Sequence, residues 1–468
     1  MTSSMSEIAF LSALDLLAQY RRKVLSPVEA TKAALAQIEA LNPKLNAFCL
    51  VDADAALAAA RASEARWLRG EPIGVVDGVP VSVKDLLLVR GWPTLRGSKL
   101  VERNQPWTED APAVAKLRAA GAVLIGKTTT PEFGWKALGD SPLTGITRNP
   151  WNPAHTPGGS SAGAAVAAAT GMGALHIGTD GGGSIRIPAS FTGIFGIKPT
   201  FGRVPAYPPS YFGLVAHVGP MTRTVADAAL MLSVMAGYED RDPYSLPSDG
   251  RDYTVGLEGG VRGVRIGYSA TLGYAQVEPE VRDGVARAAE TFAELGATVE
   301  AVDPGFASPR DAFTTLWTTG AAKLLAGLPA DRRGEMDPGL REAAAFGATK
   351  SALDWLDADA ARAALGQTMA AFHRRYDLLL TPSVAVPALP VGYDLHDPTR
   401  ARHWIDWTPF SYPFNMTRQP AANVPCGLTA KGLPIGLQLV GRLHEDGAVL
   451  RAARAFEAAR PFARPKLA

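Results

Sequence analysis

The chain is poor in cysteine: it has two, Cys49 and Cys426, among 468 residues. A secreted disulfide scaffold would need more, and no CxxC pair is present from which a tetrahedral zinc site could be built. The chain also lacks a strong charge of either sign, since its formal net charge is +2 and lysine and arginine are spread along it. These properties argue against a disulfide scaffold, a zinc module and a dedicated nucleic-acid surface.

Long hydrophobic runs are missing as well. No apolar run approaches the roughly 18 residues that cross a bilayer, and the first residues, MTSSMSEIAF, lack the basic and apolar regions of a secretory signal. We therefore expect a cytoplasmic protein with no membrane partner. What the chain does have is 47% hydrophobic and 20% charged residues, ordinary proportions for a globular protein with a buried core.

Hydrophobic patterning predicts helices that alternate with strands. Ser26-Pro27-Val28-Glu29 has the residues of a helix start, and apolar residues then recur at helical spacing to Leu41. A layered α/β fold with a mostly parallel or mixed sheet follows from this alternation. Short apolar runs predict buried strands at 79–83, 122–125, 264–268, 378–380 and 437–440.

Two segments are expected to be largely irregular. The tract 128–184 is rich in glycine, serine, threonine and proline, and one helix of small residues is expected in it near 162–170. The segment 239–263 is rich in aspartate, proline and glycine, and it is interpreted as a surface loop rather than a domain linker.

The run GAVLIGKT, residues 121–128, matches the phosphate-binding pattern G-x-x-x-x-G-K-T. A working P-loop lies between a strand and a helix, with the helix N-terminus facing the phosphates. Here Gly121 follows a helical pattern, 122–125 is itself the expected strand, and Thr129-Thr130-Pro131 follows. The order of elements therefore disfavours nucleotide binding.

A second pattern, Gly159-Ser160-Ser161-Ala162-Gly163, matches the G-x-S-x-G elbow of α/β-hydrolases and would make Ser161 the nucleophile. That alternative needs a strand immediately before the serine, but the preceding residues 152–158 contain two prolines, which do not suit a central strand. It would also need an acid and a histidine later in the chain. The histidines available to it are His373, His396, His403 and His444.

The stretch GTDGGGSIR, residues 178–186, favours a different nucleophile, Ser184. Three glycines before a serine allow a sharp turn in which successive N–H groups converge on one oxygen. The base could be Lys84, which ends the apolar run 79–83. Burial lowers the pKa of a lysine, and a neutral lysine can accept a proton. A flexible glycine loop and an ion-paired lysine are the alternative interpretations.

Taken together, these motifs resemble the amidase signature serine hydrolases. The resemblance rests on 158–190, GGSSAGAAVAAATGMGALHIGTDGGGSIRIPAS, on GVPVSVKD at 78–85, and on GIKPTFGRVP and GPMTRTVADAALML downstream. It covers most of the chain and is weakest at about 238–372. It implies an α/β fold with a large mixed β-sheet between layers of α-helices. We expect one domain, 1–468, with a helical region at about 1–70, a core at about 75–235, a variable part at about 238–375 and the end of the core at 376–468.

The resemblance also implies a role for each matching residue. Ser184 corresponds to the nucleophile, Lys84 to the base, and Ser160 to a bridging serine that follows a cis peptide bond. No metal or organic cofactor is implied. Ala162 departs from the glycine that is common there, which adds one methyl group. The residues implied to form the oxyanion hole through their backbone are Gly181, Gly182, Gly183 and Ser184, and those implied to support the site are Asp180, Arg186 and Ser161.

The substrate is less well defined by the sequence. Gly134 and Trp135 lie in a loop that borders the family's acyl pocket, Arg203 is near the site by resemblance, and Trp404 belongs to an aromatic stretch at 402–407. Aromatic residues there favour aryl or bulky alkyl amides, and carbamates and esters remain open. The alternatives are the glutaminase subunit of a tRNA-dependent amidotransferase and a catalytically silent binding scaffold. Monomer and homodimer are both left open.

Overall fold

One twisted sheet of eleven strands runs through the molecule in the computed structural model, which describes residues 4–392 and 403–467. The strand order is β1-β3-β2-β6-β8-β7-β12-β13-β11-β9-β10. Parallel pairing joins β3, β2 and β6 in one half and β11, β9 and β10 in the other, whereas the strands between them pair antiparallel. The mixed sheet expected from the sequence is confirmed. The strands are β1 (Phe48–Val51), β2 (Pro80–Lys84), β3 (Val123–Thr128), β6 (Leu175–Asp180), β7 (Phe195–Lys198), β8 (His217–Thr222), β9 (Arg265–Tyr268), β10 (Thr298–Ala301), β11 (Leu378–Pro382), β12 (Ala421–Leu428) and β13 (Pro434–Gly441), and a separate small sheet holds β4 (Asp140–Ser141) and β5 (Gly145–Ile146).

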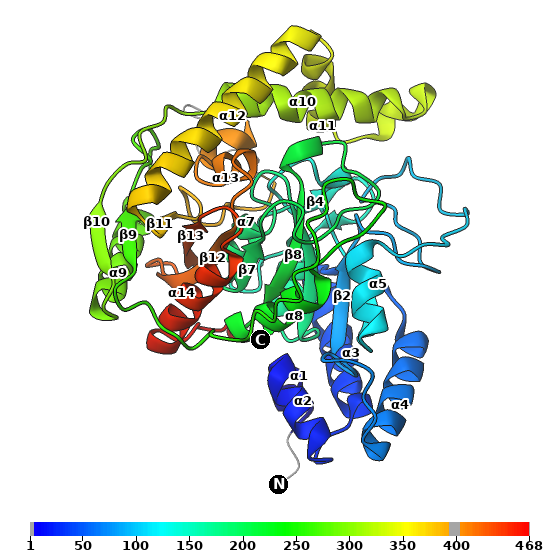
Figure 1. Cartoon of the computed structure of the whole chain (residues 1–468). Coiled ribbons are helices and arrows are strands. Elements are labelled where there is room, and N and C mark those ends of the chain that lie inside the picture. The colour runs from blue at the N-terminus through cyan, green and yellow to red at the C-terminus, as the bar shows by residue number, and fades with distance from the viewer. Residues whose placement is uncertain (1–3, 393–402, 468) are drawn as a thin grey trace.

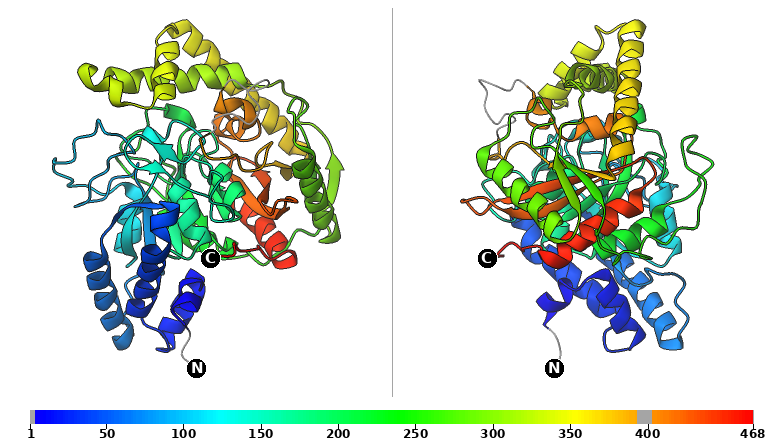
Figure 2. Two further views of the ribbon diagram at one scale, coloured as in Figure 1. Left: turned by 180° about the vertical axis from the view of Figure 1, so that it is seen from behind. Right: turned by 60° about the vertical axis from the view of Figure 1, so that its left-hand side comes forward.

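Helices lie on both faces of the sheet (Figures 1 and 2). The N-terminal helices gather at one end of the molecule, and α10, α11 and α12 lie together at the opposite end. The α-helices are α1 (Met5–Ala9), α2 (Ala13–Arg21), α3 (Pro27–Leu45), α4 (Ala53–Arg69), α5 (Pro112–Ala119), α6 (Ala162–Ala169), α7 (Arg186–Thr192), α8 (Val225–Met235), α9 (Pro279–Glu294), α10 (Arg310–Ala326), α11 (Pro338–Gly347), α12 (Ala352–Arg375), α13 (Tyr412–Met416) and α14 (Asp446–Ala459).

The two faces of the sheet belong to different hydrophobic clusters. In β11, Leu378 and Leu380 belong to a hydrophobic cluster that includes residues of α8, α9 and α14, whereas Leu379 belongs to one that includes residues of α7 and α10. This alternation is what the two-residue period of a strand requires when both faces are covered. The continuous apolar runs noted in the sequence therefore mark strands buried on both sides.

The local signals near the N-terminus are confirmed. Ser26 caps α3, its hydroxyl accepts the N–H of Glu29, and the Glu29 carboxylate accepts the N–H of Ser26.

The run GAVLIGKT forms β3 and does not form a P-loop. Lys127 is fully buried and its ammonium lies 2.8 Å from Asp85, so it is not presented to a phosphate.

The prediction for 128–184 is wrong at one place that matters. Residues 175–180 form β6, which lies in the middle of the sheet between β2 and β8. Gly178 and the polar pair Thr179-Asp180 weaken its sequence signal, but pairing on both sides supplies the stability that the local sequence lacks. By contrast, 239–263 contains no helix or strand, as expected for a surface loop. Within the described residues, no helix has the length and apolar character needed to cross a bilayer.

Candidate active site

The residues predicted to be catalytic lie at or near the carboxyl ends of two neighbouring inner strands. Lys84 is the last residue of β2, and Asp180 is the last residue of the neighbouring parallel strand β6. Ser160 and Ser161 precede α6, and Ser184 precedes α7. The peptide bond between Gly159 and Ser160 is cis, as the resemblance implied. Ends of parallel strands are where ligand sites of α/β sheets form.

Lys84 is completely buried and its Nζ contacts three hydroxyl groups. The Oγ atoms of Ser160 and Ser161 lie 2.7 and 2.9 Å from it, and Oγ1 of Thr179 lies 2.8 Å away. Burial lowers the pKa of Lys84 well below its ordinary value, and the charge of Asp180 opposes this shift. The amine is therefore held in its neutral form more readily than an exposed lysine.

The partners of Ser161 fix the direction of one of these hydrogen bonds. The Ser161 hydroxyl donates to the Thr179 carbonyl at 3.1 Å, so toward Lys84 it acts as an acceptor. A neutral amine has two N–H groups and one lone pair, and the N–H groups can be donated to Ser161 and Thr179. The lone pair then remains for the hydroxyl proton of Ser160. This arrangement suits Lys84 to receive a proton through Ser160.

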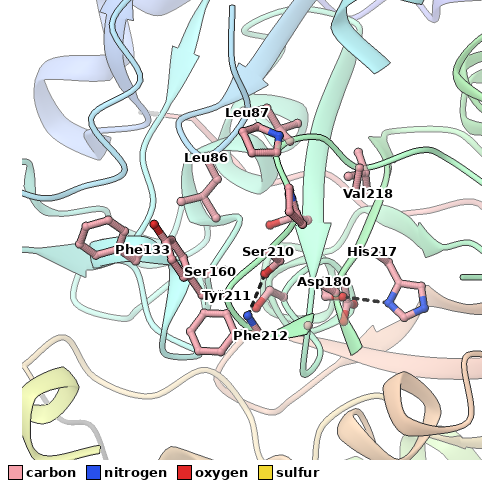
Figure 3. Close-up of a pocket in the computed structure, with 18 of the residues that line it drawn as sticks. Leu86, Leu87, Phe133, Ser160, Asp180, Ser210, Tyr211, Phe212, His217 and Val218 are labelled. Atoms are coloured by element: carbon pink, nitrogen blue, oxygen red, sulfur yellow. Dashed lines mark hydrogen bonds between the residues drawn. The ribbon is translucent and has the colours of Figure 1, made fainter. Parts of the chain in front are cut away.

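Ser160 and Ser184 line one cavity of about 110 Å³ (Figure 3). Ser184 is 6% exposed, whereas Ser161 is fully buried and is absent from the lining. In the close-up, Leu86 and Phe133 lie beside Ser160 on one side, and Asp180 and His217 lie on the other. The cavity thus brings together two hydroxyl groups, whereas Ser161 contacts Lys84 from outside the described lining.

Gly134 also lines this cavity, and its lack of a side chain is needed there. A Cβ on Gly134 would meet Cδ1 of Leu86 at 2.7 Å and the Oγ of Ser160 at 3.1 Å. The residue also has φ of +71°, a conformation that favours glycine. Gly134 therefore lets the loop 131–135 approach Ser160 closely.

The glycine loop after β6 is shaped by Asp180. The carboxylate of Asp180 accepts the N–H of Gly183 at 2.7 Å and that of Ile185 at 3.1 Å. The Gly183 N–H is therefore engaged, which corrects the prediction that all four amides of the loop face a substrate. Among described residues, the N–H groups of Gly181, Gly182 and Ser184 make no hydrogen bond.

Arg186 ties this loop to the opposite half of the sheet. It is fully buried, and its Nε and Nη2 each lie 2.9 Å from the Asp180 carboxylate. Its other N–H groups go to Ser411 O, Gln438 Oε1 and Asn415 Oδ1, so all five guanidinium hydrogens have an acceptor. Burial would raise the pKa of Asp180, but the Arg186 charge outweighs it and the pKa lies below its usual range.

Of the residues predicted to bind substrate, Gly134 belongs to the described lining of the cavity, but the two tryptophans do not. Trp135 is buried, its carbonyl accepts the Trp317 indole N–H at 3.0 Å, and its ring packs edge-on to His403. The tip of Trp404 packs against Gly182 and Phe313. Neither tryptophan is among the described residues that line the Ser160–Ser184 cavity.

Arg203 lies apart from that cavity's described lining. Its guanidinium pairs with Asp249 at 2.9 Å and with Asp446 at 3.5 Å. These two ion pairs suit Arg203 to brace its loop. In the stretch 402–407, Trp404–Trp407 forms a short 3₁₀ helix, and Arg402 lies outside the described residues, as does His396.

Sequence reasoning missed His217, at the start of β8. It lines the cavity, and its Nδ1 lies 2.8 Å from the Val215 carbonyl and 3.2 Å from that of Asp180. Burial, and then the charge of Lys198, lower the pKa of His217, so the ring is neutral. Its position depends on the antiparallel pairing of β6 with β8, which no local sequence motif predicts.

Aromatic and proline side chains from distant segments complete the cavity. Phe212 stacks on Trp317 of α10, with ring centroids 3.7 Å apart, and both rings line the cavity. The stretch 207–211 adds Tyr207, Pro208, Pro209, Ser210 and Tyr211. The space next to the two serines is therefore largely apolar and aromatic, which suits a ring-bearing ligand.

Comparison with known proteins gives a consistent result. Residues 29–450 match the family model described as Amidase. An acylamidase of Rhodococcus erythropolis is 38% identical over 98% of this chain and 97% of its own length. A glutamyl-tRNA(Gln) amidotransferase subunit from Chloroflexus aurantiacus is 36% identical, with 97% of each chain covered.

Solved structures agree with these relatives. A bacterial aryl acylamidase of the amidase signature family superposes with a TM-score of 0.91 at 33% identity, covering 97% of each chain. A 6-aminohexanoate cyclic dimer hydrolase complexed with substrate gives a TM-score of 0.88 at 28% identity, covering 98% of this chain and 99% of the other. The fold, the cluster at the strand ends and the family match lead to one assignment: the chain belongs to the amidase signature family of amide hydrolases.

Proposed function

We propose that the protein is a self-sufficient amidase that acts on aryl and bulky alkyl amides, with Ser184 as nucleophile, Ser160 as bridge and Lys84 as base. The observation that carries the proposal is the contact of 2.7 Å between Ser160 Oγ and the Nζ of buried Lys84, which also contacts Ser161 Oγ and Thr179 Oγ1. When the neutral amine donates to Ser161 and Thr179, its lone pair is left for Ser160, as a proton relay needs.

The reaction would proceed in two steps. Ser184 Oγ attacks the amide carbonyl while its proton passes to Ser160, and the Ser160 proton passes to Lys84. The tetrahedral intermediate collapses when the relay returns a proton to the departing amine, which leaves an acyl-enzyme. Water then attacks the ester by the same route, and the acid is released.

The negative oxygen of the intermediate needs hydrogen-bond donors. Because the Gly183 N–H is held by Asp180, we assign this role to the N–H groups of Gly181, Gly182 and Ser184. Asp180 and Arg186 would act by fixing the loop and would not react with substrate. In this assignment, the amide that Asp180 binds holds the loop in place, and the other three amides are left for the substrate oxygen.

The substrate class follows from the cavity. Phe133, Phe212 and Trp317 line it together with prolines and leucines, and such walls bind an aromatic or branched group better than a small polar amide. The acylamidase and aryl acylamidase named among the similar proteins agree with this substrate class. Aryl carbamates and esters also present a carbonyl group to Ser184, so the proposal includes them. The proposal does not include an oligomeric state.

A second candidate is the glutaminase reaction of an amidotransferase, because a protein of that kind is 36% identical to this chain. The aromatic walls of the cavity favour a ring-bearing group over free glutamine, whose α-ammonium finds no unpaired carboxylate in the described lining, because Asp180 is paired with Arg186. Because of the identity to the amidotransferase subunit, glutamine should be included among the substrates tested.

The test is hydrolysis of a matched panel by the wild type and by Ser184→Ala: a small aliphatic amide, an anilide, an aryl carbamate, an ester and glutamine. We expect Ser184-dependent turnover of the anilide, the carbamate or both. Turnover of glutamine alone would replace the proposal with the amidotransferase reaction. Absence of labelling by a serine-reactive phosphonate would instead support a silent scaffold.

A further inference from the structure

One arginine lining the cavity has no role in the relay or the fold described so far. Arg96 follows β2 by twelve residues, is half-buried and lines the same cavity as Ser160 and Ser184. In the part of the chain that the structure describes, its guanidinium makes no hydrogen bond or ion pair. The contrast with Arg186, whose five N–H groups are all used, makes this side chain conspicuous.

The segment that carries Arg96 is firmly anchored on both sides. Thr94 Oγ1 lies 2.5 Å from the buried Lys127 ammonium, and the Ser98 hydroxyl donates to Glu132 at 2.6 Å. The Arg96 carbonyl accepts the N–H of Phe133 at 2.7 Å, and Phe133 lines the cavity. Arg96 is thus held at a fixed place relative to the catalytic serines, while its own charged group has no partner.

The other polar groups in the lining do not neutralise this charge. Asp180 supplies the carboxylate of the described lining, and this carboxylate forms an ion pair with Arg186. His217 is engaged with backbone carbonyls and is neutral. The remaining walls are hydroxyl, aliphatic, proline and aromatic groups, so the cavity carries one positive charge that no described protein group compensates.

We propose that Arg96 is a specificity residue that binds a carboxylate, or a similar anionic group, on the non-reacting part of an amide substrate. A guanidinium presents paired N–H donors that match a carboxylate, and the apolar surroundings strengthen the interaction by keeping water away. The substrates of this site are then amides with an aromatic or aliphatic body and an acidic end. The inference rests on the proposed function, because it concerns the same cavity.

The test uses substrates that differ in charge and hardly in shape. 4-Acetamidobenzoate and 4-nitroacetanilide differ by a carboxylate and a neutral, isosteric nitro group on the amine side. Succinanilic acid and 4-methylpentananilide, which has an isopropyl group in place of the carboxylate, make the corresponding comparison on the acyl side. The variants are Arg96→Met, which removes the charge, and Arg96→Lys, which keeps it. Neither introduces glycine, so both keep the backbone constraint at this residue, where φ is +58°.

In at least one pair, Arg96→Met should raise KM for the acidic substrate about tenfold or more and change kcat/KM for its neutral partner less than about threefold. Arg96→Lys should recover part of the difference, and added salt should weaken the preference of the wild type. Because each substrate is compared between variants, the electronic effect of the nitro group cancels.

Two results would overturn the inference: equal losses for acidic and neutral substrates, which indicate a structural role, or no change for either acidic substrate. These are distinct from failure of the proposed function. That failure would appear as a wild type with no Ser184-dependent turnover of the neutral anilides.

Discussion

Nζ of Lys84 and Oγ of Ser160 lie 2.7 Å apart, and no carboxylate is paired with this lysine among the described residues. A lysine in such a place does not carry its charge easily, because burial lowers its pKa and the distant charge of Asp180 opposes only part of that effect. The relation between these two residues therefore determines how activity should depend on pH.

We expect kcat/KM to rise with pH as Lys84 loses its proton, and then to level off. The rise should be centred well below pH 10.5, the ordinary lysine value, because the folded pKa is lowered. Lys84→Met should lose at least about a thousandfold in kcat/KM and should keep its circular dichroism spectrum. A flat profile from mildly acidic to alkaline pH would remove Lys84 from the role of base.

Substitutions of two serines, Ser184 in the cavity lining and Ser161 outside it, test which one is the nucleophile. Ser184→Ala should abolish hydrolysis, because Ser184 is the serine that reaches the cavity without a fixed partner for its hydroxyl among the described residues. Ser161→Ala is the matched control: it removes one acceptor from Lys84 and should lower kcat without abolishing turnover. Mass spectrometry of a phosphonate-labelled protein should place the adduct on Ser184. Residual activity of Ser184→Ala above about a hundredth of wild type would transfer the role to Ser161.

Much of this site was accessible from the sequence because its residues carry unusual local requirements. Three glycines before Ser184 and a lysine at the end of an apolar strand allowed a nucleophile and a base to be proposed from the residues themselves, whereas the roles of Ser160, Asp180 and Arg186 came from the family resemblance. The strands at 122–125, 378–380 and 437–440 could be predicted because continuous apolar runs mark strands buried on both faces, as β3, β11 and β13 are.

The rest depends on contacts between distant segments. β6 escaped prediction because Gly178 weakens its pattern, and β8 because Gly219 and Pro220 do so. Once β6 pairs with β8, His217 is brought to the cavity, and α10 adds Trp317 from far along the chain. Such neighbours follow from strand order, which local propensity does not determine.

The glycine loop offers a test of the assigned oxyanion donors. A Cβ on Gly183 would lie 2.5 Å from Cβ of Ser411, and the residue has φ of +123°, so alanine there must displace the loop. We expect Gly183→Ala to lower kcat about a hundredfold or more, the loss typical of a disturbed oxyanion hole. Gly366→Ala is the control, because a Cβ there meets no described atom within 4 Å. Equal activity of the two variants would contradict the assigned role of the loop.

Asp180 should contribute to stability as well as to loop geometry. Asp180→Asn leaves the buried Arg186 without its counter-charge, and breaking a buried pair in this way costs about 3–5 kcal/mol. Asp359→Asn is the matched control, because Asp359 pairs with Arg362 at 2.6 Å but is 30% exposed, and removing such a pair costs about 1 kcal/mol or less. Urea unfolding of both variants at neutral pH measures the difference.

The sign of the pH effect provides a second readout for Asp180. Its pKa is lowered in the folded state, so its contribution to stability is present above the unfolded value of about 4 and is lost as pH falls through the folded value. The wild type should therefore lose stability relative to Asp180→Asn only below about pH 4, and the gap between them should be constant from about pH 6 to 8. A gap that closes in the neutral range would mean that Asp180 is not held ionised by Arg186, and the loop would then need another support.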